Sequence, residues 1–386
     1  MRLAFVSGRM LSIEGDVVHA DAGVGRLVDA LSDRVDEITV VMSRALDRRD
    51  SHDHRLKIPA SRVVALPHMP SAVSAMRHGR VCRTTIGRVE RATDVTVLQL
   101  PFAPPWALAP TTHPRVYHAC ADVVEVLKAN RHRRGLVRVA AGTMARAMDG
   151  WQRVLGRLPH ARVVANGDAL ARKMGGKPVV STTMLEADLL SVPRRRATRA
   201  PRILFVGYLR PEKGLDVLVD AYRLLLTTHP DAELVIVGSQ DLQDGGGVRE
   251  LREALERLGS RGRVETRGQI PFGPVLFQEF ADADLLVVPS RSEGTPRVLV
   301  EARALGCPVV ASRVGGIPTS ITDGVDGLLV PSDDAPALRT AIARVLDDAP
   351  LRARLVEAGL ARARTRTVEA FAEMLLGECR ALLETR

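Results

Sequence analysis

The fold of this chain is decided by one stretch, Leu285–Pro318, which reads LLVVPSRSEGTPRVLVEARALGCPVVASRVGGIP. Its first four residues form an apolar run closed by Pro and Ser, a pattern typical of a buried parallel strand. Thr295 and Pro296 resemble an N-cap and a first helical residue, and apolar residues continue at helical spacing over Val298–Leu305. Gly306 ends the predicted helix, and a second apolar strand follows. The stretch therefore predicts a strand–helix–strand unit of a parallel α/β sheet.

Two carboxylates flank the start of this predicted helix. Glu293 precedes it, and Glu301 lies roughly 7–8 Å further along the helix axis. The free amide groups and the positive dipole end between them suit a phosphate group. Carboxylates on either side of an anion site fit hydroxyl groups, so the pattern suggests a nucleotide sugar, with sugar hydroxyls at Glu293 and ribose at Glu301. The alternative interpretation is a pair of ordinary surface glutamates.

The motif S-x-x-E-G-T-P-x-V-L-x-E-A, followed by D-G-x-x-G-L-L-V-P, resembles the E-x7-E signature of retaining glycosyltransferases of family 4. The similarity continues backwards through F-V-G-Y-L-R-P-E-K-G-L-D-V-L-V-D-A and is strong from about residue 202 to 348. It implies an α/β fold, GT-B, with two Rossmann-like parallel-sheet domains facing a cleft. The expected parts are an acceptor-binding domain (1–188, with helix 368–386 packing back on it), a linker (189–201) and a donor-binding domain (202–367).

The resemblance also implies roles for individual residues. Lys213 is expected to stabilise the diphosphate, and His118, at the end of a predicted strand, to touch the donor sugar or to serve only its own loop. Tyr208 stands where the family has an arginine, so Arg210 either reaches the same phosphate from a shifted position or has lost that role. With Glu293, these are the catalytic candidates. The remaining donor-binding candidates are Gly207, Gln269, Ile270, Gly294, Thr295, Pro296, Arg297, Val298 and Glu301.

The acceptor side is less well marked. The family usually opens its first helix with a Gly-Gly pair, but Val18 and His19 are the nearest equivalents here, at the end of a predicted loop from Gly8 to Ala20. Acidic residues near the expected acceptor cleft could meet ammonium groups of an acceptor. These candidates are Glu14, Asp16, Asp122 and Glu125.

Charge differs sharply between the two halves. Of the 55 basic residues 50 are arginines, and residues 1–200 have a net charge of +14 whereas residues 201–386 have −4. An anionic partner is therefore expected on the first half. Nucleic acid is not expected, because no recognition motif is present, aromatic residues make up only 3% and the second half is acidic.

A basic amphipathic helix is predicted over residues 136–158. Such a helix can lie on an anionic membrane or pack on a sheet with its basic face in solvent. The sequence has no run of 18 apolar residues, its four cysteines lie far apart, and its first residues read as a strand rather than a signal peptide. We expect a cytoplasmic protein, with peripheral contact to the inner face of an anionic membrane as an open alternative.

The reaction implied by the resemblance is transfer of a hexose or amino-hexose from a nucleotide diphosphate sugar, with a UDP-sugar preferred, to a small hydroxyl-bearing acceptor. Retention at the anomeric carbon is implied, and no metal or other cofactor is expected. The acceptor is either an aminocyclitol in antibiotic biosynthesis or a lipid-linked cell-envelope glycan. The competing interpretations are a nucleotide-sugar epimerase of the same fold and a non-catalytic nucleotide-sugar-binding protein.

Overall fold

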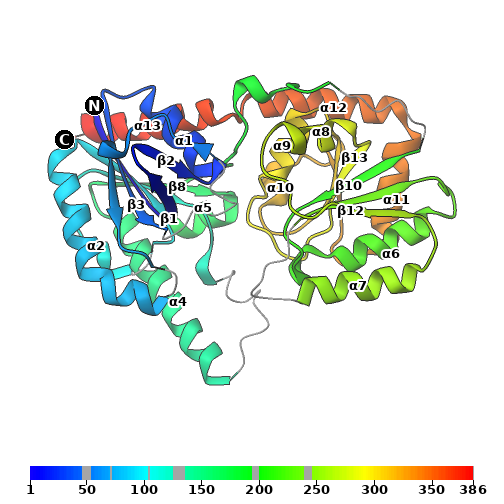
Figure 1. Cartoon of the computed structure of the whole chain (residues 1–386), viewed down its shortest axis with the longest axis horizontal. Helices are drawn as coiled ribbons and strands as arrows, with labels where there is room; N and C mark the ends of the chain where they lie inside the picture. The colour runs from blue at the N-terminus through cyan, green and yellow to red at the C-terminus, as the bar shows by residue number, and fades with distance from the viewer. Residues whose placement is uncertain are drawn as a thin grey trace. The chain divides into compact units, whose positions relative to one another are not determined.

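The computed structural model describes residues 1–45, 54–69, 72–102, 105–124, 135–193, 200–238 and 246–385. The chain forms two compact units, Met1–Thr183 with Val368–Arg386, and Met184–Thr367. Each unit is a largely parallel β-sheet with helices packed on it (Figure 1). The division falls at residue 184 rather than at residue 189.

The first unit is built on seven parallel strands in the order β5-β3-β1-β6-β7-β8-β9. All residues of β6 and β7 are buried, as expected for strands covered on both faces. The strands are β1 (Arg2–Glu14), β3 (Glu37–Arg44), β5 (Val63–Leu66), β6 (Val95–Leu100), β7 (Arg115–Ala119), β8 (Ala161–Asn166) and β9 (Lys177–Val179). The helices are α1 (Ala22–Ser32), α2 (Ala72–Ala92), α4 (Gly135–Gly156), α5 (Asp168–Met174) and α13 (Val368–Glu384), and the short 3-10 turns are η1 (Ala60–Arg62) and η2 (Pro105–Ala107).

The predicted loop from Gly8 to Ala20 is wrong. β1 continues to Glu14, with a bulge after Ser7, and pairs antiparallel with β2 (Val17–Ala20), which in turn pairs with β4 (His54–Arg55). Gly15 adopts φ 62° at the turn between them. The alternating residues before and after E-G-D are the hairpin signal that the loop assignment overlooked.

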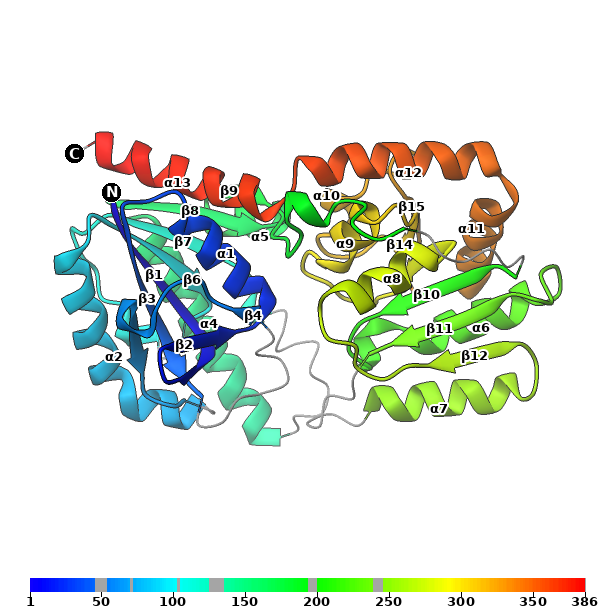
Figure 2. The same ribbon diagram turned by 45° about the horizontal axis from the view of Figure 1, so that its top comes forward.

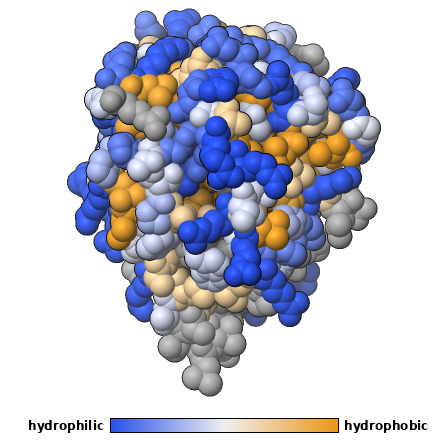
Figure 3. Space-filling model, turned by 90° about the vertical axis from the view of Figure 1, so that its left-hand side faces the viewer, coloured by the Kyte–Doolittle hydropathy of each residue, from blue (hydrophilic) through white to orange (hydrophobic). Residues whose placement is uncertain are grey.

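The helix α4 packs on the core of the first unit through its C-terminal half. Leu155 is fully buried there, and Trp151 and Leu158 pack against the same core. Met144 and Val154 remain exposed on the same helix. Figure 3 shows a face of this unit on which hydrophilic side chains predominate and hydrophobic ones form smaller areas between them. Within the described part of the chain, no helix is long and apolar enough to cross a membrane.

The second unit is a six-stranded, fully parallel sheet in the order β12-β11-β10-β13-β14-β15. Three of its strands, β10, β11 and β12, lie side by side in Figure 2. This is the doubly wound order 3-2-1-4-5-6, in which the strand order reverses between β10 and β13. Residues of α6, α7 and α11 share one core with β10, β11 and β13, while α8 and α9 contact β10 and β14. The strands are β10 (Arg202–Val206), β11 (Glu233–Val237), β12 (Arg263–Thr266), β13 (Leu285–Val288), β14 (Val309–Ser312) and β15 (Leu328–Val330).

The helices of the second unit follow the strands in alternation. They are η3 (Glu186–Asp188), η4 (Pro211–Lys213), α6 (Leu215–Leu225), α7 (Gly246–Leu258), α8 (Pro274–Asp282), α9 (Val298–Ala304), α10 (Ile317–Ser320), α11 (Ala335–Asp347) and α12 (Ala349–Arg364). The first part of the predicted linker is bonded to this unit: Leu190 N donates to Ala304 O (2.9 Å) and Gln278 Nε2 donates to Pro193 O (3.0 Å).

Candidate functional site

The strand reversal of the second unit places two predicted residues side by side. In doubly wound sheets ligands bind beyond the carboxyl ends of the strands at such a reversal, here beyond β10 and β13. Lys213 ends the turn η4 after β10, and Glu293 lies in the loop after β13. Lys213 Nζ donates to Glu293 Oε1 at 2.6 Å, and Ser290 Oγ donates to the same oxygen at 2.8 Å. The two residues most strongly implied by the motif therefore form one half-buried ion pair.

Glycines allow the loops around this pair to pack backbone on backbone. A Cβ on Gly315 (φ +52°) would lie 1.8 Å from Glu293 O, and one on Gly316 would lie 2.2 Å from Gly294 O. Gly214 (φ +66°) approaches Pro289 O in the same way, at 2.2 Å for an added Cβ. These three positions accept only glycine, because any side chain would displace the Glu293 loop. The V-G-G-I-P motif was the signal for two of them.

The predicted start of α9 is wrong. The helix begins at Val298, with Arg297 as an N-cap whose side chain makes no capping hydrogen bond, so Thr295 is not the cap and Pro296 is not helical. Thr295 Oγ1 is instead buried, with no hydrogen-bond partner among the described residues. Gly294–Arg297 therefore precede the helix, and Gly316 N donates to Gly294 O at 2.8 Å.

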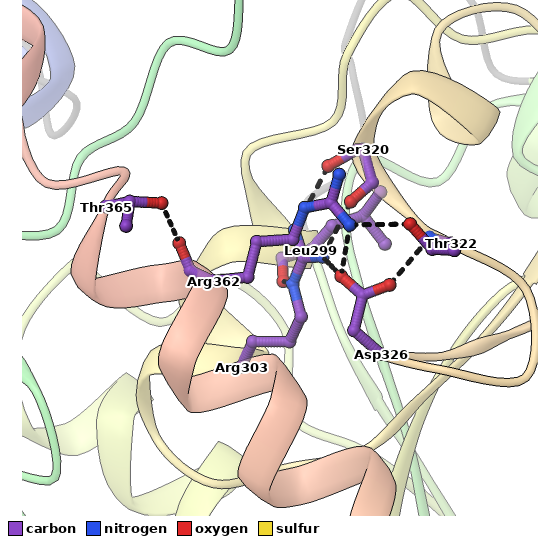
Figure 4. A network of polar contacts seen from close by, with 7 residues as sticks. All are labelled: Leu299, Arg303, Ser320, Thr322, Asp326, Arg362 and Thr365. Carbon is purple, nitrogen blue, oxygen red and sulfur yellow. Dashed lines mark hydrogen bonds and ion pairs between the residues drawn. The ribbon is translucent and has the colours of Figure 1, made fainter.

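A buried network anchors α9 from behind (Figure 4). Arg303 lies on this helix, two residues after the buried Glu301, and its Nη1 donates to Asp326 at 2.6 Å and to Ser320 O at 2.7 Å. Arg362 of α12 also donates to Asp326, at 3.0 Å. Burial lowers the pKa of Arg303 to about 10 against the opposing effect of Asp326, so its guanidinium stays charged near neutral pH. The helix that presents Glu301 is thereby tied to α12 and to the turn after α10.

Arg291 joins three loops at the same edge of the sheet. Its Nε donates to Asp333 (2.6 Å), its Nη2 to Asp216 (2.6 Å) and its Nη1 to Pro211 O (2.8 Å). Its backbone N donates to Glu212 O at 2.8 Å. The hydrogen bond that Arg291 donates to Asp216, and then the one to Asp333, raise the pKa of the Arg291 guanidinium against the effect of burial. Sequence reasoning missed this residue, because its partners lie 42 to 80 positions away.

A cavity of about 740 Å³ lies on the other side of β10. The predicted Gln269 lines it together with Leu209 and Gly238, and Ile270 follows Gln269 in the chain. The further lining residues are Ile236, Leu251, Arg252, Leu255, Glu256, Thr266 and Gly268. Gly238, whose added Cβ would lie 1.9 Å from Gly207 O, brings the ends of β10 and β11 together here.

Arg210 lies close to Tyr208 and to Glu212. Its guanidinium carbon is 5.2 Å from the centre of the Tyr208 ring, and its Nη1 is 3.8 Å from Glu212 Oε1. The guanidinium therefore lies over the ring of Tyr208, whose side chain is 55% exposed. Arg210 directly precedes the turn η4, which follows β10 and ends at Lys213. It thus lies at the carboxyl edge of the sheet, where the resemblance places the diphosphate.

In the first unit, His118 is held at the carboxyl end of β7. Its ring is buried, and its Nε2 lies 3.2 Å from Asn166 Oδ1 at the end of β8. The Phe371 ring of α13 meets it edge-on at 5.0 Å between centroids, and Cys120 Sγ lies 3.6 Å from Nδ1. Asn166 was missed by the sequence analysis, although a polar residue at the end of a parallel strand was a usable signal.

Comparison with known proteins identifies the second unit. The family model described as "Glycosyl transferases group 1" matches residues 190–362. This segment belongs to the group 1 glycosyltransferases. Curated relatives include D-inositol 3-phosphate glycosyltransferases of Acidothermus cellulolyticus (38% identity over 188 residues, 48% of this chain and 42% of the relative) and Thermobifida fusca (33% over 238 residues, 57% and 55%). The chain spans about half the length of these relatives.

Solved structures show the fold of the whole chain. Sucrose-phosphate synthase from Thermosynechococcus elongatus aligns over 100% of both chains with a TM-score of 0.70 and 21% identity. HepE from Anabaena, in complex with UDP and glucose, aligns over 98% of this chain and 99% of its own with a TM-score of 0.68 and 20% identity. The chain therefore has the α/β GT-B fold of two parallel-sheet domains.

Three of the four acidic residues predicted on the acceptor side lie in the described part of the first unit. Asp122 pairs with Lys173 (2.8 Å) and accepts from Val124 N (2.9 Å), and Asp16 accepts from Ala60 N (3.1 Å). Glu14 is exposed at the end of the β1–β2 hairpin, and Glu125 lies outside the described residues. Asp16 and Asp122 thus each accept a hydrogen bond within the first unit, and their contact with an acceptor stays a prediction.

Proposed function

We propose that the chain is a retaining hexosyltransferase that moves a sugar from a UDP-sugar to a hydroxyl group of a small acceptor. The observation that carries the proposal is the Lys213–Glu293 ion pair at the strand reversal of a group 1 glycosyltransferase domain. A nucleotide diphosphate sugar has an anionic diphosphate next to a sugar with hydroxyl groups. At this edge of the sheet the lysine suits the diphosphate, and the carboxylate suits the sugar hydroxyls.

The donor is proposed to lie along the carboxyl edge of the second unit. Lys213 neutralises the diphosphate, with Arg210 three residues earlier in the same turn, and Glu293 accepts hydrogen bonds from sugar hydroxyls. Thr295 Oγ1, buried without a partner among the described residues, would gain one in a ligand oxygen. The cavity beside Gln269 takes the base. HepE, which shares the fold, has been crystallised with UDP-glucose, which supports UDP as the nucleotide.

In the proposed reaction the bond between the anomeric carbon and the β-phosphate oxygen breaks, and a bond from that carbon to the acceptor oxygen forms on the same face. The acceptor hydroxyl proton passes to the leaving diphosphate. Charge accumulates on that leaving group, so Lys213 and Arg210 stabilise the transition state more than the ground state. Because these side chains supply the positive charge, no metal ion is proposed, and turnover is expected to survive EDTA.

The acceptor is proposed to be a cyclitol or sugar that carries an anionic group. The matched relatives are named for D-inositol 3-phosphate, a phosphorylated cyclitol. The net charge of +14 over residues 1–200 favours an anionic acceptor. A lipid-linked acceptor would bring the exposed Met144 and Val154 of α4 near a membrane. Salt-sensitive sedimentation of the protein with anionic vesicles would therefore support a lipid-linked acceptor, and no sedimentation would support a soluble cyclitol or sugar.

The first test is a thermal-shift screen of the whole chain against UDP, GDP, ADP and dTDP. Ligand at 100 times its Kd stabilises the folded state by about 2.7 kcal/mol, and we expect such a shift with UDP alone. Incubation with UDP-glucose and inositol phosphate, followed by NMR of the product, then reports the anomeric configuration. A sugar epimer released without an acceptor would indicate the epimerase, and UDP binding without turnover would indicate a non-catalytic binding protein.

A further inference from the structure

We propose that Arg291 is a positioning residue for sugar transfer, which locks the turn carrying Lys213 against the loop carrying Glu293. The inference rests on the proposed function for its catalytic consequence, but the lock itself is a property of the fold. Arg291 lies two residues before Glu293, and Pro211, whose carbonyl it binds, lies two residues before Lys213. Arg291 and the carbonyl group that it binds therefore each lie two residues from one member of the ion pair.

The guanidinium uses its three nitrogens on three different segments. Nη1 binds the η4 turn, Nη2 binds Asp216 in the first turn of α6, and Nε binds Asp333 before α11. A planar fork with fixed donor directions holds three acceptors in a defined arrangement, whereas a lysine ammonium on a flexible stem does not. The segments after β10, β13 and β15 are thereby joined at one point.

Asp333, one of the acceptors of Arg291, has an uncommon backbone conformation. Asp333 adopts φ 58°, a left-handed conformation that is uncommon for residues other than glycine and in which Asn and Asp are enriched. Arg291 is only 25% exposed, and two carboxylates share its charge. An ordinary surface ion pair joins two side chains and contributes little. Arg291 instead bridges two carboxylates and a main-chain carbonyl at the edge of the sheet where the donor is proposed to bind.

Loss of the Arg291 contacts is expected to change the position of Lys213 more than the affinity for the donor. A misplacement of about 1 Å in a catalytic group can cost on the order of 100-fold in rate. Lys213 is proposed to act on charge that develops in the transition state, so its displacement is expected to lower kcat more than it weakens donor binding. Arg291→Lys keeps the charge and removes the fork, and we expect kcat to fall about 10- to 100-fold with the donor KM within about threefold.

The matched control is Arg202→Lys. Arg202 begins β10 at the opposite end of the strand from Lys213 and forms a buried ion pair with Glu279 at 2.7 Å. Loss of that fork is expected to lower the Tm while kcat, measured well below the Tm, stays at the wild-type value. A purely structural role for Arg291 predicts the same result for Arg291→Lys, which would overturn the proposal. Asp333→Asn, which suits the same left-handed backbone, gives a second variant with one anchor weakened and a smaller loss of kcat.

Hydrogen exchange of the unliganded chain tests the lock independently of any substrate. Arg291→Lys is expected to speed amide exchange in residues 211–216 and 291–294, and Arg202→Lys is expected to leave these segments unchanged. Unchanged exchange in Arg291→Lys would overturn the lock even if the rate falls. If the wild-type chain binds no nucleotide, the proposed function fails, and the exchange result still decides whether Arg291 joins the two loops.

Discussion

Each unit carries a lysine–carboxylate pair beyond the carboxyl end of one of its strands, and the two pairs differ in what surrounds them. Lys213 pairs with Glu293 at 2.6 Å, between loops that follow the two strands of the reversal. Lys173 pairs with Asp122 at 2.8 Å and also with Asp149 of α4 at 2.7 Å. Burial lowers the pKa of Lys173, but the hydrogen bonds that it donates to both carboxylates raise the pKa above its usual value. Lys173 thus has two carboxylate partners among the described residues, whereas Lys213 has one, Glu293, which we propose a substrate shares.

The difference between the two lysine pairs depends most on Glu293, and its substitution is expected to have the largest effect, a loss of transfer rate. Glu293→Ala should reduce transfer by about 100- to 1,000-fold, because it removes an oriented acceptor for sugar hydroxyls and leaves Lys213 unpaired. Steady-state rates with UDP-glucose, with the Tm measured in parallel, check this expectation. Glu293→Gln keeps the shape of the side chain and serves as the matched control, with a smaller loss. If Glu293→Ala turns over normally, the two lysine pairs are equivalent and the active edge lies elsewhere.

The buried Arg303–Asp326 pair supplies the next effect, on stability. Removing one partner of a buried ion pair typically costs about 3–5 kcal/mol, because the remaining charge stays buried. We expect Asp326→Ala to lower the free energy of unfolding by that amount, measured by denaturant titration. In the first unit Arg115 holds Glu90 through Nε at 2.6 Å and Nη2 at 3.0 Å, so Glu90→Ala is the matched substitution there.

Asp326→Ala and Glu90→Ala should both lower stability, but they should differ in their effect on UDP binding. Asp326→Ala loosens α9, which carries Glu301, so it should also weaken UDP binding, whereas Glu90→Ala should lower stability alone. Equal effects of the two variants on UDP affinity would mean that the buried network of the second unit has no special connection to the donor site. The double substitution Arg303→Met with Asp326→Leu should be less damaging than Asp326→Ala, since no fully buried charge is left unpaired and only the partly exposed Arg362 loses its carboxylate partner.

The sequence predicted the parallel sheet of the second unit and singled out Lys213 and Glu293 from local signals, but it did not predict the ion pair between them. Apolar runs closed by Gly, Pro or Ser marked β10 and β13, and the motif marked Lys213 and Glu293. The start of α9 was mispredicted because cap chemistry at Thr295 is overridden by the close approach of Gly315 and Gly316, a contact about 20 residues away. The roles of Arg291 and Asn166 depend on partners in other strands and loops, which residue spacing along one chain does not specify.

Of the two lysine–carboxylate pairs compared above, the Lys173 pair is expected to show the smaller effect when it is broken. Lys173→Met leaves Asp122 and Asp149 without their shared cation, and it should cost about 1 kcal/mol of stability, since the pair is only partly buried. Lys57, which is 62% exposed and pairs with Asp33 in the same unit, is the matched control, and Lys57→Met should change stability less. UDP binding should be unaffected by either substitution. A loss of transfer in Lys173→Met comparable with that in Glu293→Ala, at unchanged UDP affinity, would instead place Lys173 at the acceptor, and the first unit would then hold a second active lysine pair.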